Sequence, residues 1–599
     1  MNQRSFWESI IGVVFLILLI TATSVSSLHA IQRPNILMIV ADDAPKRDFS
    51  CYGNKVVKTP NIDQLAAEGM RFENMLTASP TCSPSRTTLY TGLYPIRHGG
   101  HANHSDVKPG TKSMAHYMAD LGYRVILVGK KHVKPFKESF PFEYYQDGQI
   151  SGQTVGEDVR KIFANPGDKP LCIVLAKFSA HSEWPHNRYN YDPDSLDVPA
   201  YLVDTPETRD LRARYYSKVT EMDEGVGKVL DWLQAYNLSE NTLTIYTADH
   251  GSHWPHEKHN LYDAGVNVPF IVRWPNRIKA GSVSYALTSY VDVLPTLIDV
   301  AGGEPLQANN NEDMLDGRSF LPVLIGETSE HNTEVFACYT WGVMSAYPMR
   351  AIRTKTHKYI WNIDSQFRFP WSSDTGWWGS FPNTFEILPQ SRHAISTPWS
   401  KVLQSLRESW LRKASTDPQA AARVYAEQFR PPEELYDLRK DPDELNNLAE
   451  KPEHKQLKTS LRASLDQWMQ QQGDLGDSVY HKEENQTSFA PDGPRKRFLD
   501  EFYSRQTVIN VWMSPIDGLE RARAELTCPV WRAAIYYTLD GSEPTRDSKR
   551  YTQPFSMTPP TTLKAKGFFQ GGETPLKVVE LSSVDYRFHY QYHAKPTSF

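Results

Sequence analysis

Apolar runs alternate with amphipathic segments from Pro34 to about residue 302. Short runs that are apolar throughout are predicted strands, at 35–40, 124–129, 170–179, 242–248 and 268–274. Apolar side chains at helical spacing predict helices between them, at 59–70, 112–123, 206–236 and 291–302. Wholly apolar strands that alternate with helices are typical of parallel sheets covered on both faces. The sequence therefore predicts an α/β domain with a large, mostly parallel sheet between helices.

The pattern changes in the second half of the chain. Periodicity weakens between Gly379 and Gln428, and 433–472 then predicts a short strand, a turn and a closing helix. Short strands with turn punctuation follow Thr507 and predict a small all-β, immunoglobulin-like sandwich. The expected organisation is an α/β domain at 31–370, a smaller α+β subdomain at 371–480, a polar linker at 481–506 and a sandwich at 507–599.

The first 30 residues have the features of a signal peptide. Arg4 supplies a positive start, Ile10 to Ala22 an apolar run, and Ala30 a small residue for cleavage. An uncleaved membrane anchor is the alternative. The expected location is periplasmic or extracellular, in a bacterial source. The five cysteines are too few and scattered for a disulfide framework.

Composition narrows the class of partner. The chain has 599 residues, 40% of them hydrophobic, which favours a large globular core over disorder. A net charge of −5 argues against a nucleic-acid binder, so an anionic ligand would need a local positive pocket. The oligomeric state is left open, with a homo-oligomer allowed.

Polar side chains follow four of the predicted strands. Ligands of open α/β sheets bind beyond the carboxyl ends of the strands, so these residues are expected to meet at one edge. They are Asp42-Asp43, Lys130-Lys131-His132, His181 and Asp249-His250.

Two kinds of chemistry are combined at this edge. Asp42, Asp43 and Asp249 are hard oxygen donors beside His250, a set that suits Ca²⁺, with Mg²⁺ as the alternative. Cationic and imidazole side chains beside such an ion predict a pocket for an anion with several oxygens, such as sulfate or phosphate. These side chains are Arg86, Lys130, His132, His181 and Lys258.

Cys82 lies in the small, polar stretch "TASPTCSPSRTTLYTGLYP". Pro84 suits the first turn of a helix, whose N-terminus would face Cys82. A helix N-terminus lowers a thiol pKa and stabilises anions. Cys82 is therefore predicted to be a nucleophile or the precursor of one. A core thiol and one half of a disulfide are the alternatives.

The run from Cys82 to Arg86, followed by "TTLYTGLYP", resembles the C-x-P-x-R signature of type I sulfatases. Further segments are similar to that family in the same order: Asp42-Asp43, "GKKH", "SAHSEWP", "TADHG", "EKHNLYDAGVNVP" and "ELYDLRKDPDELNNLA". Ala180 departs from the family's proline before the histidine. The resemblance spans roughly Pro34 to Gln472 and implies an alkaline-phosphatase-like fold.

The resemblance also implies roles for the residues. A formylglycine-generating or anaerobic sulfatase-maturing enzyme would oxidise Cys82 to Cα-formylglycine, whose hydrate attacks sulfur. Asp42, Asp43, Cys82, Asp249 and His250 would hold the metal. The remaining roles fall to five side chains: Lys130, His181 and Lys258 for the sulfate, His181 also for the leaving group, and Arg86 with His132 for the hydrate.

The segments "GKKHVKPFKESFPFEYY" and "SAYPMRAIRTKTHKYIWNIDSQFRFPW" resemble the heparan N-sulfatase branch, although Trp341-Gly342 replaces an expected histidine-glutamate pair. The predicted substrate is the N-sulfate of glucosamine in heparin-type saccharides. His101, His104 and Arg350 are the predicted sugar contacts.

Three alternative functions are an O-sulfatase on another sulfated polysaccharide, a phosphoester or phosphonate hydrolase, and a non-catalytic glycan-binding protein. The stretch "IYYTLDGSEPT" near the C-terminus resembles the chitobiase/β-hexosaminidase C-terminal module. That module would be a sugar-binding domain or a structural cap.

Overall fold

The computed structural model describes most of the chain. The described residues are 33–145, 157–176, 178–304, 315–341, 346–363, 365, 398–428, 430–474, 476, 509–516, 520–527, 534–569 and 572–584. The predicted signal peptide or anchor at 1–30 and the predicted linker at 481–506 lie outside them. Within the described ranges, no helix is both long and apolar enough to cross a membrane.

A nine-stranded sheet forms the centre of the largest unit, in the order β4-β3-β5-β1-β6-β7-β2-β8, with β9 beside β2. Pairs along the sheet are parallel except that β7 runs antiparallel to both β6 and β2. This architecture confirms the predicted α/β fold. The strands are β1 (Asn35–Ala41), β2 (Met70–Leu76), β3 (Arg124–Gly129), β4 (Glu143–Tyr145), β5 (Leu171–Ala176), β6 (Thr242–Ala248), β7 (Asn267–Arg273), β8 (Ser282–Ser284) and β9 (Thr288–Ser289).

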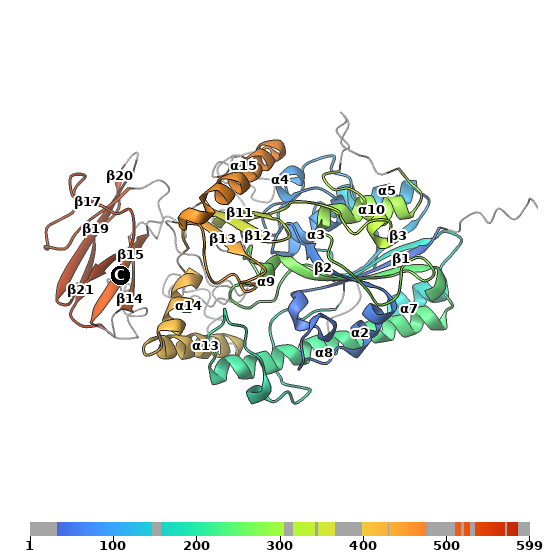
Figure 1. Cartoon of the computed structure of the whole chain (residues 1–599), viewed down its shortest axis with the longest axis horizontal. Helices are drawn as coiled ribbons and strands as arrows, with labels where there is room; N and C mark the ends of the chain where they lie inside the picture. The colour runs from blue at the N-terminus through green and yellow to red at the C-terminus, as the bar shows by residue number, and fades with distance from the viewer. Residues whose placement is uncertain are drawn as a thin grey trace, which may run out of the picture.

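Helices cover both faces of this sheet (Figure 1). Because side chains alternate along a strand, β1 contributes Leu37 and Ile39 to one core and Ile36 and Met38 to the other. One face is covered by α2 (Pro60–Glu68), α7 (Glu157–Ala164) and α8 (Pro206–Ala235), and the other by α3 (Cys82–Thr91), α5 (Met114–Asp120) and α10 (Val293–Val300). Shorter helices are α4 (Pro95–His98), α6 (Phe136–Ser139), α9 (Asp263–Val266) and α11 (Leu321–Leu324).

A second, antiparallel sheet has the order β10-β11-β12-β13. Its strands are β10 (Val335–Trp341), β11 (Ala346–Arg353), β12 (His357–Asn362) and β13 (Glu433–Asp437). The helix α15 (Lys455–Gln472) packs on it through Leu461, Leu465 and Trp468, as the closing helix in the sequence predicted.

Two helices occupy a stretch in which the sequence showed only weak periodicity: α13 (Pro398–Ala414) and α14 (Pro418–Gln428). The indole of Trp410 in α13 is fully buried and donates to the Thr208 hydroxyl of α8 at 2.8 Å. Leu406 and Leu411 of α13 join the same apolar core as α8, so packing against this distant helix holds α13 in place.

The C-terminal region is all-β, as predicted, with two small sheets that share one apolar core. One sheet holds β14 (Asn510–Ile516), β15 (Arg521–Thr527) and β18 (Phe555–Met557). The other holds β16 (Ala534–Thr538), β17 (Lys549–Arg550), β19 (Thr561–Phe569), β20 (Gly572–Glu573) and β21 (Lys577–Leu581). The Arg523 guanidinium lies 4.3 Å from the ring centroid of Tyr425 in α14, so the sandwich contacts this helix.

Candidate active site

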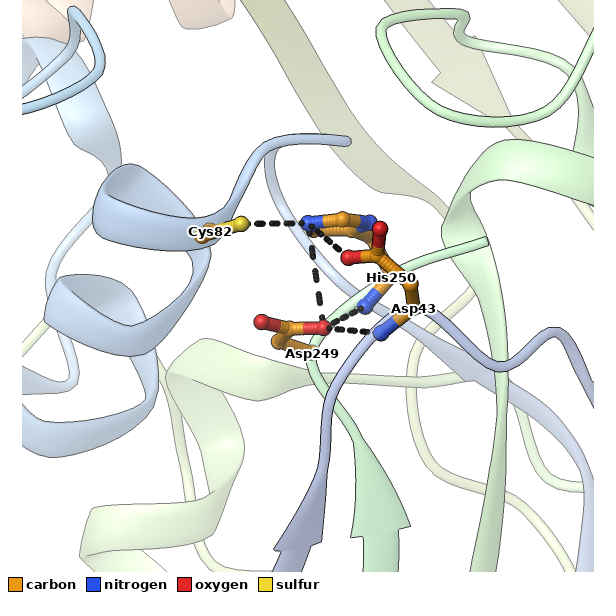
Figure 2. A group of neighbouring side chains, drawn as sticks. All are labelled: Asp43, Cys82, Asp249 and His250. Carbon is orange, nitrogen blue, oxygen red and sulfur yellow. Dashed lines mark hydrogen bonds and ion pairs between the residues drawn. The ribbon is translucent and has the colours of Figure 1, made fainter. Parts of the chain in front are cut away.

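The predicted carboxylates meet beyond the carboxyl ends of β1 and β6, two neighbouring parallel strands. Asp42 and Asp43 follow β1, and Asp249 follows β6. The Asp249 Oδ1 atom accepts from the backbone N–H groups of Asp43 and His250, both at 3.0 Å (Figure 2). The bond from Asp43 joins the two strand ends, and the bond from His250 orients the Asp249 carboxylate.

The loop after β6 is held tightly against α9. The N–H of Gly251 donates to the carbonyl of Gly265 at 2.9 Å. A side chain at Gly251 would meet the carbonyl oxygen of Ala264 at 2.2 Å, so this close approach requires glycine. The tight loop brings His250 and Lys258 back toward the carboxylates.

Cys82 is the first residue of α3, as the position of Pro84 predicted. Its buried Sγ lies 3.3 Å from Nε2 of His250 (Figure 2). Burial disfavours the thiolate, but Lys130, Lys258 and His250 outweigh that effect and hold the pKa of the Cys82 thiol well below its usual range. The sulfur thus lies where cationic side chains stabilise a negative charge. If Cys82 is oxidised, its sulfur marks the place of a formylglycine oxygen.

Arg86 lies one turn further along α3 and is fully buried. Its Nε donates to Oδ2 of Asp249 at 3.0 Å, and its Nη2 donates to Oδ1 of Asp42 at 2.9 Å. Arg86 therefore ties the nucleophile helix to both strand ends. Its Nη1 is a buried donor without a partner among the described residues, so the predicted contact with a formylglycine hydrate stays a prediction.

The two predicted lysines each neutralise one carboxylate. The Lys130 Nζ donates to both oxygens of Asp42 at 2.6 and 2.8 Å, and the Lys258 Nζ donates to both oxygens of Asp43 at 2.9 and 2.7 Å. Burial lowers the pKa of each lysine, but the neighbouring carboxylates and the Cys82 thiolate together raise it by more. Both ammonium groups are therefore charged in the pocket.

The predicted histidines occupy different sides of the site. Nε2 of His132 lies 2.8 Å from Nδ1 of His104, so these two imidazoles form a pair. Nδ1 of His181 lies 2.6 Å from the carbonyl oxygen of Ser182, and its Nε2 lies 3.8 Å from Oδ2 of Asp43. The His181 side chain is 33% exposed, which leaves it accessible to a ligand.

Arg350, which the sequence suggested as a sugar contact, is engaged by other groups of the chain. It lies in β11 with its guanidinium fully buried, where Nη2 donates to Oδ1 of Asp474 at 3.0 Å and Nε donates to Oδ2 of the same carboxylate. Nη1 donates to the carbonyl oxygens of Tyr339 and Met349. Nitrogens that already hold a carboxylate and two carbonyls favour a structural role for Arg350, and its contact with the sugar stays a prediction.

His101 is also largely enclosed. Its Nδ1 lies 3.1 Å from Oγ1 of Thr340. Burial and the charge of Arg350 lower the pKa of His101 to about 4, so the imidazole is neutral near pH 7. A contact between the sugar and His101 or His104 stays a prediction.

The donor set fits a divalent cation. Asp43, Cys82, Asp249 and His250 each offer one ligand atom, and these atoms lie within 4.8 Å of one another. Burial raises the pKa of Asp249 to about 7 despite His250 and Arg86, which shows that the chain's own cations do not fully compensate the clustered carboxylates. A hard cation would supply that compensation. Asp42, also a predicted ligand, lies outside this group and is engaged by Lys130 and Arg86.

One residue of the pocket was missed from the sequence. His253 lies beside Asp43 and His181, with which it forms a second group of potential ligands. The signal was present in "DHGSHWPHEKHN", where histidines recur every three residues. Only the loop geometry decides which of them faces the pocket.

Three family models match the chain. The Sulfatase model matches residues 34–303, and the model "N-sulphoglucosamine sulphohydrolase, C-terminal" matches residues 251–368. The model of the chitobiase/beta-hexosaminidase C-terminal domain matches residues 520–580. These matches confirm the resemblances seen in the sequence.

Curated relatives extend the match over most of the chain. An ulvan-active sulfatase of Formosa agariphila is 34% identical over 458 residues, which cover 74% of this chain and 81% of the relative. The N-sulphoglucosamine sulphohydrolase of Homo sapiens is 28% identical over 498 residues, which cover 73% of this chain and 90% of the relative.

The fold has solved counterparts. A structure in complex with its substrate D-glucosamine-2-N,6-O-disulfate superposes with a TM-score of 0.54 at 19% identity, covering 75% of this chain and 100% of that chain. At this identity the similarity shows the shared fold, which is that of the alkaline-phosphatase-like sulfatases.

Proposed function

The chain belongs to the sulfatase family, a family of sulfuric ester hydrolases, and from this premise we propose that it removes sulfate from a sulfated glycan. The observation that carries the proposal is the setting of Cys82. Its side chain begins α3, and its sulfur lies 3.3 Å from His250 among Lys130, Lys258 and the carboxylates of two strand ends. A pocket with this charge pattern suits a tetrahedral oxyanion ester.

Different residues would bind the sulfate group and transfer the proton. Lys130 and Lys258 hold positive charge on either side of Cys82 and would orient the sulfate oxygens. The Ser182 carbonyl can only accept a hydrogen bond, so Nδ1 of His181 carries a hydrogen. Its Nε2 is then the atom that exchanges a proton with the leaving oxygen.

This chemistry requires two further groups, which the chain would have to acquire. Formylglycine at Cys82, formed by a maturing enzyme, would supply a hydroxyl nucleophile in place of the thiol. A divalent cation, Ca²⁺ or Mg²⁺, held by Asp43, Asp249 and His250 with the side chain at position 82, would polarise a sulfate oxygen. The chain's own contribution is to fix both groups on the rigid ends of β1 and β6 and the first turn of α3.

The proposed substrate is an O-sulfate ester of an extracellular polysaccharide of the ulvan type. The relative at 34% identity is named for that activity, whereas the N-sulphoglucosamine sulphohydrolase is 28% identical. The N-sulfate of glucosamine in heparin-type saccharides is the second candidate, because the C-terminal model of that enzyme matches residues 251–368. Both substrates agree with export of the protein to the periplasm or the medium.

The experiment is a comparison of substrates with the matured, Ca²⁺-loaded protein. Ion chromatography would measure sulfate released from ulvan oligosaccharides and from N-sulfoglucosamine, and phosphate released from a phosphate monoester. The Cys82→Ala variant is the matched control. We expect sulfate release from the O-sulfated substrate to exceed the other two and to require Cys82. Faster phosphate release would favour the phosphohydrolase alternative, and binding of the glycan without turnover would favour a non-catalytic protein.

A further inference from the structure

His253 is a buried imidazole in the loop after β6. Its side chain is 8% exposed, and its ring lies edge-on to the ring of His181 with 5.5 Å between centroids. Its Nδ1 lies 3.2 Å from the Ser182 hydroxyl oxygen and 3.7 Å from Oδ2 of Asp43. His253 therefore borders the same pocket as the residues assigned above, although neither the sequence motifs nor the family resemblance included it.

The second nitrogen of this ring, Nε2, is buried and has no hydrogen-bond partner among the described residues. A buried polar atom without a partner costs free energy, so this atom calls for a partner such as a water, an ion or a ligand. Within the described part of the chain, the one recorded partner of the Ser182 hydroxyl is Nδ1 of His253. The Ser182 hydroxyl can donate to Nδ1, and in that tautomer the ring hydrogen lies on Nε2.

The groups around His253 define the pocket that its ring borders, with Nδ1 as the nitrogen nearest Asp43. Oδ2 of Asp43 lies 2.7 Å from Nζ of Lys258 and 3.8 Å from Nε2 of His181. His253, Lys258 and His181 thus surround one carboxylate oxygen and border the space assigned to the anion. An N–H donor on this ring would add to the donors of Lys258 and His181 in the same pocket.

We propose that His253 is a further substrate-binding residue, which donates its Nε2 hydrogen to an oxygen of the bound sulfate group. The inference rests on the proposed sulfatase function and deepens it. Ser182 acts as a positioning residue: its hydroxyl orients His253, and its carbonyl oxygen lies 2.6 Å from Nδ1 of His181. One residue thereby sets the orientation of two imidazoles that face the same anion.

Replacing His253 with each of two amides separates this role from a purely structural one. The amide nitrogen of glutamine can take the place of Nε2, whereas that of asparagine can reach only the place of Nδ1. Calorimetry on the Ca²⁺-loaded protein would measure the binding of inorganic sulfate to the wild type and to the His253→Gln, His253→Asn and His253→Ala variants. The exposed His186 of the preceding loop provides a matched control, His186→Gln.

We expect the Ala and Asn variants to bind sulfate about ten- to a hundredfold more weakly, the range for a hydrogen bond to a charged group. The Gln variant and the His186→Gln control should stay close to the wild type. Unchanged affinity in His253→Ala, or better rescue by Asn than by Gln, would overturn the proposal.

Turnover of the wild type distinguishes this failure from failure of the proposed function. If the wild type releases sulfate from a glycan but His253→Ala binds sulfate normally, only the role of His253 is wrong. If the matured wild type neither binds sulfate nor releases it, the proposed function and the role of His253 are both rejected.

Discussion

Replacing Arg350 with alanine should destabilise the protein rather than alter its choice of sugar. The guanidinium is fully buried and holds the Asp474 carboxylate, which is buried as well and follows the C-terminus of α15. Without Arg350, Asp474 loses its cationic partner and the carbonyls of Tyr339 and Met349 lose the hydrogen bonds from Nη1. Removing one member of a buried ion pair costs about 3–5 kcal/mol. At about 2 cal/mol/K of unfolding entropy per residue, a unit of more than roughly 400 residues should lose roughly 3–5 °C in its melting midpoint.

The assay is thermal unfolding of a double-mutant series. Asp474→Ala alone should destabilise by a similar amount, and Arg350→Met combined with Asp474→Leu should recover much of the loss, because apolar side chains leave no buried charge. Turnover of a small aryl sulfate and of a sulfated glucosamine should change by the same factor at a temperature where the variants are folded. An unchanged midpoint, together with a selective loss on the glucosamine, would refute this reasoning and make Arg350 a sugar contact.

Three further predictions address the nucleophile, the metal and a buried carboxyl. Cys82→Ala should lower sulfate release by several orders of magnitude without changing the melting midpoint. Cys51 lies outside the pocket, so Cys51→Ala should keep most of the activity. Comparable turnover in both variants would exclude Cys82 as the nucleophile. Chelation by EDTA should lower both activity and melting midpoint, and Ca²⁺ should restore both; full activity in metal-free protein would exclude the cation site. Burial raises the pKa of Asp223 to about 6, so its contribution to stability is present below its ordinary pKa and is lost as the pH rises through about 6. The stability of Asp223→Asn relative to the wild type should therefore rise by up to about 3 kcal/mol between about pH 4 and pH 7, measured by urea unfolding, and a pH-independent difference would contradict the raised pKa.

The sequence predicted the central sheet and the placement of the site because both follow from local pattern. Wholly apolar runs define β1, β3, β5 and β6, and parallel strands bring their carboxyl ends to one edge. The position of Pro84 gave the start of α3 and hence the orientation of Cys82. These inferences needed no knowledge of distant contacts.

The features that sequence reasoning missed depend on partners far away in the chain. The strand β2 has polar residues at partly buried positions, which interrupt its apolar pattern. The helix α13 packs through Trp410 on Thr208, which is 202 residues away in the chain. Arg350 and Asp474 are 124 residues apart, and an arginine in a motif suggests a ligand contact until its carboxylate partner is seen. For the same reason the four histidines after Asp249 could not be told apart without the loop that turns His253 toward Asp43.

The central claim is that Cys82, converted to formylglycine, is the nucleophile of a sulfatase. Mass spectrometry of the Cys82 peptide, on preparations made with different amounts of a maturing enzyme, tests it most directly when each preparation is also assayed for sulfate release. The account predicts a peptide in which an aldehyde oxygen replaces the thiol, and a specific activity proportional to the fraction of that peptide. Full sulfate release from protein whose Cys82 is entirely an unmodified thiol would contradict it.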